Sequence, residues 1–164
     1  MRRYSQRSLK SLEGIHLDLR RVIDRALQTS PLDFVVIEGL RTLDRQKELV
    51  KRGASRTLNS RHLTGHAVDL VPIGADGELS WHWPDYHQLG PAVELAARDL
   101  GVALVWGGRW PKFQDGPHFE LDRFAYPADG DKQEPEPQPA QPAQPSGIAG
   151  LFAAILRALK GGRG

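Results

Sequence analysis

The chain has 164 residues, with 22 Lys and Arg, 20 Asp and Glu, six His and no Cys. This length is enough for one domain with a buried core and an additional segment. The absence of Cys excludes disulfide scaffolds, Cys-based zinc fingers, iron–sulfur clusters and thiol catalysis. A net charge of +2 does not indicate a nucleic-acid-binding protein. We therefore expect no nucleic-acid partner. We also expect a monomer.

The charges are distributed unevenly along the chain. Residues 1–61 hold 14 basic and 7 acidic residues, whereas residues 62–126 hold 4 basic and 9 acidic ones. A solvated surface of mixed charge would explain this asymmetry. The alternative is that the basic part faces an anionic substrate while the acidic part surrounds a cation.

The N-terminal elements follow from hydrophobic periodicity. Apolar residues at helical spacing predict one amphipathic helix over residues 8–28. The apolar, β-branched run over residues 34–37 predicts a buried strand. Residues 43–52 are predicted to form a second helix that Gly53 terminates.

The following elements complete a small domain. Residues 67–71 predict a second strand, and residues 84–100 predict a helix. Two further strands are predicted over residues 103–106 and 117–121. This order indicates an α+β domain over residues 1–126, in which helices pack on a small antiparallel sheet.

The composition changes abruptly after this domain. Residues 127–146 contain six Pro and no large apolar residue, which predicts an extended linker. Residues 147–164 predict an amphipathic helix with basic residues near its end. It is shorter than the roughly 20 apolar residues that span a bilayer, but it suits contact with an anionic membrane surface. Docking on the domain and self-association are the alternatives for this segment.

Two segments concentrate potential metal ligands, residues 60–69 and residues 115–120. A catalytic zinc site uses three protein ligands of nitrogen or oxygen type and leaves one position for water. His62, Asp69 and His118 would supply such a set. His66 lies four residues after His62, but the intervening glycine and the following strand argue against a helical metal pair. Four tryptophans could line a sugar-binding groove, and the alternative is that they pack in the core or at its rim. They are Trp81, Trp83, Trp106 and Trp110.

These segments match a known family. The pattern Ser-x-His-x-x-Gly-x-Ala-x-Asp over residues 60–69 resembles the zinc D-Ala-D-Ala peptidases related to VanX and VanY, whose fold is hedgehog-like. The pattern Asp-x-x-His-Phe-Glu over residues 115–120 extends the resemblance. The upstream segment 38–42, Glu-Gly-Leu-Arg-Thr, is similar to the phage endolysins that are L-alanyl-D-glutamate peptidases. The similarity covers residues 5 to 124.

The resemblance implies a role for each matching residue. The zinc (Zn2+) ligands would be His62, Asp69 and His118. Asp115 matches the catalytic general base. Arg41 matches an arginine that holds a substrate carboxylate or polarises the scissile carbonyl, and Ser60 matches a position near the substrate. We expect Glu120 to orient a histidine ligand rather than to act directly.

The implied function is hydrolysis of the L-Ala–D-Glu bond in peptidoglycan stem peptides by a zinc endolysin, assisted by a membrane-active C-terminal helix. No apolar run of signal-peptide length occurs near the N-terminus. We therefore expect synthesis in the cytosol and access to the wall through a holin or membrane damage. Two alternatives are a D,D-carboxypeptidase or dipeptidase of cell-wall remodelling, and a non-catalytic zinc-stabilised binding module. The presence of Asp115 argues against the binding module.

Overall fold

The computed structural model describes residues 2–128. The predicted helix of residues 147–164, and all but the first two residues of the predicted linker, lie outside this range. The helices are α1 (Gln6–Ser11), α2 (Leu17–Thr29), α3 (Leu43–Lys51) and α4 (Trp83–Asp99), with short 3-10 helices η1 (Arg61–Thr64) and η2 (Gly107–Arg109). The strands are β1 (Phe34–Glu38), β2 (Ala67–Pro72), β3 (Leu104–Trp106) and β4 (His118–Leu121).

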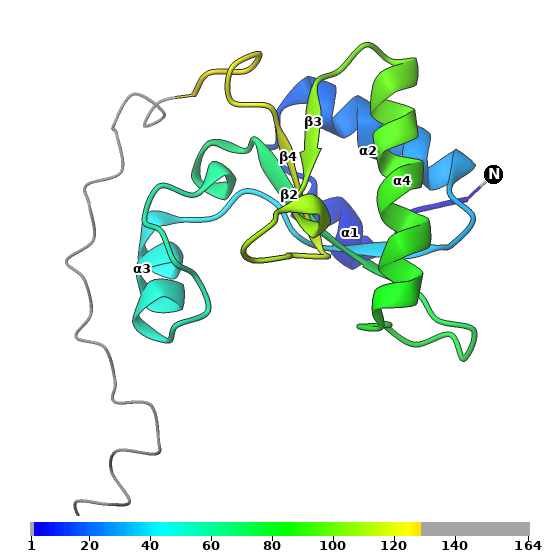
Figure 1. The fold of residues 1–164 in the computed structure, drawn as a ribbon, viewed down its shortest axis with the longest axis horizontal. Helices are drawn as coiled ribbons and strands as arrows, with labels where there is room; N and C mark the ends of the chain where they lie inside the picture. Colours follow the sequence, from blue (N-terminus) through cyan, green and yellow to red (C-terminus); the bar gives the residue numbers. More distant parts are fainter. Residues whose placement is uncertain (1, 129–164) are drawn as a thin grey trace, which may run out of the picture. The chain divides into compact units, whose positions relative to one another are not determined.

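The four strands form one antiparallel sheet in the order β1-β2-β4-β3. Helices α2 and α4 lie side by side against it, and α3 stands apart on the opposite side (Figure 1). The prediction of an α+β domain with helices on a small antiparallel sheet is therefore confirmed. Among the residues that the structure describes, no helix is long and apolar enough to cross a bilayer.

The two faces of the sheet differ in chemistry. Successive side chains of a strand point to opposite faces, so Val68 and Leu70 of β2 face the core while Asp69 faces away from it. In β4, Phe119 is fully buried in the core cluster and alternates with His118 and Glu120. The core face packs on α2 and α4, and the opposite face collects the titratable side chains.

The predicted single helix over residues 8–28 is wrong, because the chain breaks between α1 and α2. The first helix ends at Ser11, and the turn that follows it closes at Gly14, which adopts a left-handed conformation with φ of +73°. His16 begins the second helix, and its Nδ1 accepts a hydrogen bond from the Asp18 N–H at 3.2 Å. Its backbone N–H donates to the Gly65 carbonyl at 2.8 Å. The break is thus stabilised by contact with a distant segment, which periodicity does not reveal.

Candidate metal centre

The sheet places two of the predicted ligands side by side. Asp69 of β2 and His118 of β4 are directly opposite in the antiparallel register, so their side chains share one face. The third, His62, lies in η1, where a loop was expected. The Ser60 hydroxyl caps this short helix by accepting a hydrogen bond from the His62 N–H at 3.4 Å. Ser60 therefore positions a ligand-bearing turn.

The three side chains converge on one point. His62 Nε2, His118 Nδ1 and Asp69 Oδ1 form a triangle in which each pair of atoms is 3.3 Å apart. A tetrahedral zinc ion with bonds of about 2.0–2.1 Å to nitrogen and oxygen separates its ligand atoms by about 3.3–3.4 Å. The donor set and its spacing therefore fit three ligands of a zinc ion. Both histidines are buried, whereas the Asp69 side chain is 16% exposed.

Outer contacts fix which ring nitrogen of each histidine faces the centre. His62 Nδ1 lies 2.8 Å from the Gly39 carbonyl oxygen, which can only accept a hydrogen bond. His118 Nε2 lies 2.9 Å from Glu120 Oε2. With a metal bound, each ring would carry its hydrogen on the outer nitrogen and present a lone pair at the inner one. The expectation that Glu120 orients a histidine agrees with this contact.

Gly39 reaches His62 through a close backbone approach. A Cβ added at this glycine would lie 1.9 Å from the Ser11 carbonyl oxygen. Any larger residue would push the segment away from α1 and carry with it the carbonyl that orients His62.

The charges within the cluster shift the pKa values of Asp69 and His118. Burial alone would raise the pKa of the Asp69 carboxyl, but the charges and hydrogen bonds of His62 and His118 outweigh burial and hold the pKa below its ordinary value. For His118, burial lowers the pKa, but hydrogen bonds and charges of Asp69 and Glu120 raise it to about 9. In the metal-free cluster His118 is therefore protonated at neutral pH, and a metal ion must displace that proton.

Asp115 lies beside this cluster. Its N–H donates to the Gly107 carbonyl at 3.0 Å, and its own carbonyl accepts from the His118 N–H at 3.4 Å. Burial raises the pKa of the Asp115 carboxyl, and the negative charge of Asp69 raises it further. A carboxylate with a raised pKa is a better proton acceptor near neutral pH.

Arg41 is buried against acidic partners rather than extended into solvent. Its Nε and Nη2 donate to the two carboxylate oxygens of Glu38 at 2.8 and 2.6 Å, and its Nη1 donates to Gln46 Oε1 at 2.6 Å. Its Nη2 also lies 3.7 Å from Asp69 Oδ2. The side chain is only 8% exposed. The structure thus places Arg41 at the cluster, but Glu38 occupies the bidentate face expected to hold a substrate carboxylate.

Comparison with known proteins identifies the family. The model of the phage L-alanyl-D-glutamate peptidase family matches residues 1–126. The chain belongs to this family. It is 30% identical over 128 residues to the L-alanyl-D-glutamate peptidase of Escherichia phage T5, an alignment covering 76% of this chain and 92% of that protein.

The chain is also similar to bacterial proteins. Identity is 32% over 102 residues with the peptidoglycan L-alanyl-D-glutamate endopeptidase CwlK of Bacillus subtilis, covering 55% of this chain and 61% of that protein. The crystal structure of the L-Ala D-Glu endopeptidase ChiX of Serratia marcescens superposes with a TM-score of 0.72 and 51% identity. That alignment covers 76% of this chain and 93% of ChiX.

Several contacts of this peptidase-family site were not predicted from the sequence. Glu38 lies opposite Asp69 because a bulge between Val36 and Glu38 shifts the register of β1. Gln46, fully buried, joins Arg41 to the following loop by donating to Ser55 Oγ at 2.8 Å. The sequence could not indicate this role, because it does not show that Gln46 is buried. His66 lies outside the cluster, with its ring 5.1 Å from that of His16.

The tryptophans divide between core and surface. Trp106 is buried and donates its Nε1–H to the Gly116 carbonyl at 2.8 Å. The Trp110 ring lies 5.2 Å from the His118 ring. Trp81 and Trp83 are exposed. Core packing therefore holds for Trp106, whereas the other three are placed for rim packing or for a sugar-binding groove.

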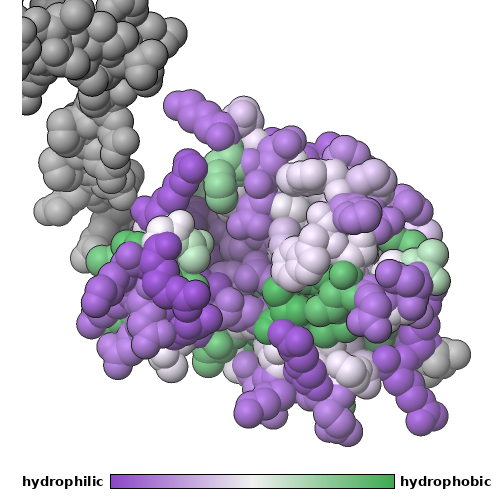
Figure 2. Space-filling view, turned by 90° about the horizontal axis from the view of Figure 1, so that it is seen from below, coloured by the Kyte–Doolittle hydropathy of each residue, from purple (hydrophilic) through white to green (hydrophobic). Residues whose placement is uncertain are grey.

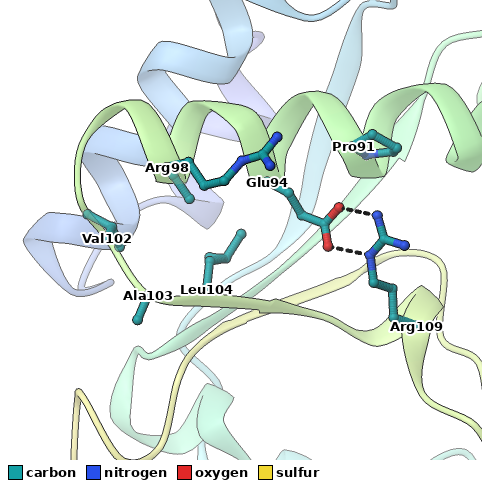
Figure 3. Close-up of a pocket in the computed structure, with 8 residues that line it drawn as sticks. Pro91, Glu94, Arg98, Val102, Ala103, Leu104 and Arg109 are labelled. Carbon is teal, nitrogen blue, oxygen red and sulfur yellow. Dashed lines mark hydrogen bonds and ion pairs between the residues drawn. The ribbon is translucent and has the colours of Figure 1, made fainter.

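The surface is hollowed between the lobe that carries α3 and the rest of the domain (Figure 2). The loops that follow α3 and η2 touch each other, since the Arg56 guanidinium lies 4.2 Å from the centre of the Phe113 ring. A different cavity of about 400 Å³ lies between α4 and β3 and is bordered by the Glu94–Arg109 ion pair (Figure 3). None of the cluster residues lines that cavity, so it is separate from the candidate metal centre.

Proposed function

We propose that this protein is a zinc-dependent endopeptidase that hydrolyses the L-Ala–D-Glu bond of peptidoglycan stem peptides. The observation that carries the proposal is the 3.3 Å triangle of His62 Nε2, His118 Nδ1 and Asp69 Oδ1, found in a chain of the L-alanyl-D-glutamate peptidase family. The names of the phage T5 and Bacillus relatives support the bond that is cleaved. These names do not specify the metal. The spacing of the three donor atoms supports zinc.

In this proposal each residue of the site has a separate role in amide hydrolysis. When bound, zinc lowers the pKa of the water it holds from 15.7 to about 7. Asp115 accepts the proton of the attacking water and returns it to the amine that leaves with D-Glu. The raised pKa of the Asp115 carboxyl favours this exchange near neutral pH. His62, Asp69 and His118 hold the ion.

For Arg41 we propose an electrostatic role. Glu38 would have to leave before the bidentate face of Arg41 could bind a substrate carboxylate. In its observed position, the guanidinium stabilises Asp69 and adds positive charge beside the reacting centre. Ser60 contributes by holding the turn that carries His62, rather than by touching the substrate.

The proposal is tested by digesting purified peptidoglycan and identifying the new termini by mass spectrometry. We expect new N-terminal D-Glu, loss of that product with a chelator, and a loss of at least about 100-fold in rate for Asp115→Asn, because general-base catalysis contributes roughly 10²–10⁴-fold. The matched control is Asp99→Asn, which removes an exposed carboxylate paired with Arg25 and should keep the wild-type rate.

The same digestion separates the alternatives. Release of D-Ala alone would favour a D,D-carboxypeptidase or dipeptidase. Zinc binding without any cleavage would favour the binding module. Full activity in the presence of chelator would contradict the metal-dependent mechanism.

We further propose that residues 147–164, which lie outside the described residues, contact an anionic membrane and assist lysis. The sequence places Arg157, Lys160 and Arg163 in this segment beside apolar residues at helical spacing. Under this proposal the monomeric enzyme is made in the host cytoplasm and reaches the wall through a holin or membrane damage.

Deleting residues 147–164 should spare cleavage of isolated peptidoglycan but weaken killing of intact cells, because only intact cells present a membrane to cross. The checks are the rate of turbidity loss with isolated walls and the count of surviving cells. Replacing the three basic residues by Gln is the matched variant, and it should weaken killing in the same direction. Equal killing by all forms would contradict the membrane role.

A further inference from the structure

A second hollow, of about 510 Å³, lies between α4 and η2. It adjoins the cavity of Figure 3, because Pro91 and Arg109 border both. Its other lining residues are His87, Trp106, Gly108 and Gln114. None of the three proposed metal ligands lines it, so a molecule bound there would not have to displace the metal.

This hollow borders the loop that holds the proposed general base. The Asp115 N–H donates to the Gly107 carbonyl at 3.0 Å, and the residues next to this pair, Gly108 and Gln114, line the hollow. The Gln114 amide nitrogen donates to the Gly108 carbonyl at 3.1 Å. Two hydrogen bonds therefore connect the wall of the hollow to the segment that carries Asp115.

The lining combines polar groups with flat apolar faces. His87 and Gln114 are exposed, and they offer a ring nitrogen and an amide for hydrogen bonding. The rings of Pro91 and Trp106 add apolar surface. Trp83, which is 38% exposed, continues this surface, since its ring lies 5.7 Å from the His87 ring. A sugar presents the matching combination, with hydroxyl groups at the edge of its ring and C–H groups on its faces.

The charge of the lining is balanced. Of the lining residues that the structure describes, only Arg109 carries a permanent charge. Its Nε and Nη2 donate to the two carboxylate oxygens of Glu94, both at 2.6 Å (Figure 3). The hollow therefore suits a neutral ligand better than an anion.

The proposed substrate carries a neutral sugar close to the bond that is cleaved. In peptidoglycan the nitrogen of L-Ala is joined through a lactyl group to an N-acetylated amino sugar of the glycan strand. The L-Ala residue and the lactyl group together span about 7 Å when extended. An enzyme that cleaves after this L-Ala must accommodate the sugar near its reacting centre, whereas an enzyme that removes the terminal D-Ala need not.

We propose that the hollow between α4 and η2 binds the N-acetylated amino sugar to which the stem peptide is attached. His87 and Gln114 hydrogen-bond its polar groups, and the preference for glycan-linked peptide depends on these two residues. This inference rests on the proposed function, because it requires that the cleaved bond lie one residue from the sugar. It adds a binding contact and no chemical step.

The test compares two substrates of the full-length zinc-loaded enzyme. One is the stem peptide attached to its disaccharide, and the other is the same peptide with an acetyl group in place of the lactyl group and sugars. We expect kcat/KM to be about tenfold or more higher on the sugar-bearing substrate, the factor for one or two neutral hydrogen bonds. N-acetylmuramyl-L-alanine should also inhibit competitively at a lower concentration than N-acetyl-L-alanine, because it retains the sugar.

The variants His87→Leu and Gln114→Met remove the polar groups with little change in side-chain size. Each should lower the ratio of the two kcat/KM values by about two- to tenfold, the factor for one neutral hydrogen bond. A purely structural role would lower both values together and leave the ratio unchanged. The matched control is His82→Leu, which replaces an exposed histidine at the start of α4 that does not line the hollow. Its ratio should equal that of the wild type.

A wild type that exposes D-Glu equally fast from both substrates would overturn the inference and leave the proposed function standing. A preference for the sugar-bearing substrate that His87→Leu and Gln114→Met both retain would also overturn it, because the sugar would then bind elsewhere. The proposed function fails separately, through the product of the wild type. Release of D-Ala in place of new N-terminal D-Glu would overturn the bond assignment, and with it the reason for a sugar in this hollow.

Discussion

At the scale of single residues, the proposed site depends on a few buried charges that neutralise one another. Asp69 lies between two histidines on one side and Arg41 on the other. Arg41 is in turn balanced by Glu38. Removing one partner from such a set leaves a charge in a poorly solvated place, which costs more than the pair itself contributes.

This reasoning gives a prediction for two similar ion pairs. Glu38 and Glu94 each bind an arginine through both carboxylate oxygens, but Arg41 is 8% exposed and Arg109 is 61% exposed. Glu38→Gln should lower the free energy of unfolding by about 1.5–3 kcal/mol, the usual range for hydrogen bonds to charged groups. Glu94→Gln should lower it by less than about 1 kcal/mol, because water solvates Arg109.

Urea unfolding of the two variants at the same pH measures this difference. The two glutamates have similar exposure, 29% and 22%, so the contrast isolates the burial of the arginine. Equal losses of stability would show that burial of Arg41 does not decide the strength of the pair.

At the scale of elements, periodicity predicted every strand and the helices α3 and α4 to within two residues of their ends. These elements have local signals, such as the β-branched run in β1 and the glycine after α3. The break between α1 and α2 had none, because it depends on Gly14 and on the bond from His16 to the distant Gly65. The short helices η1 and η2 were not predicted either, since three or four residues show no periodicity.

The sequence predicted the part of the candidate site that consists of side chains with distinctive chemistry. Spacing and family resemblance selected His62, Asp69 and His118, and the structure brings these three together. The sequence could not reveal the Gly39 carbonyl that orients His62, because every residue has a carbonyl. It also could not reveal that a bulge sets Glu38 opposite Asp69 and so occupies Arg41.

At the scale of the whole molecule, the cluster joins three elements of the domain, one of which lies about fifty residues further along the chain. His62 comes from η1, Asp69 from the centre of the sheet, and His118 from β4. An ion bound by all three would hold η1 on the sheet, and its binding would stabilise only the folded chain. Zinc at about 100 times its dissociation constant would raise the free energy of unfolding by about 2.7 kcal/mol.

This stabilisation should grow with pH. The pKa of His118 is raised to about 9 in the metal-free protein, above the ordinary value of 6.5. Stability contributed by the protonated form is complete below pH 6.5 and is lost as pH rises toward 9. Over the same range fewer protons compete with the metal. The unfolding temperature, measured with and without zinc at pH 6, 7 and 8, should therefore show a zinc-dependent increase that widens with pH. This increase should disappear in His118→Ala. It should persist in His87→Ala, which replaces an exposed histidine outside the cluster. A zinc effect that is independent of pH, or that survives in His118→Ala, would show that the ion binds elsewhere.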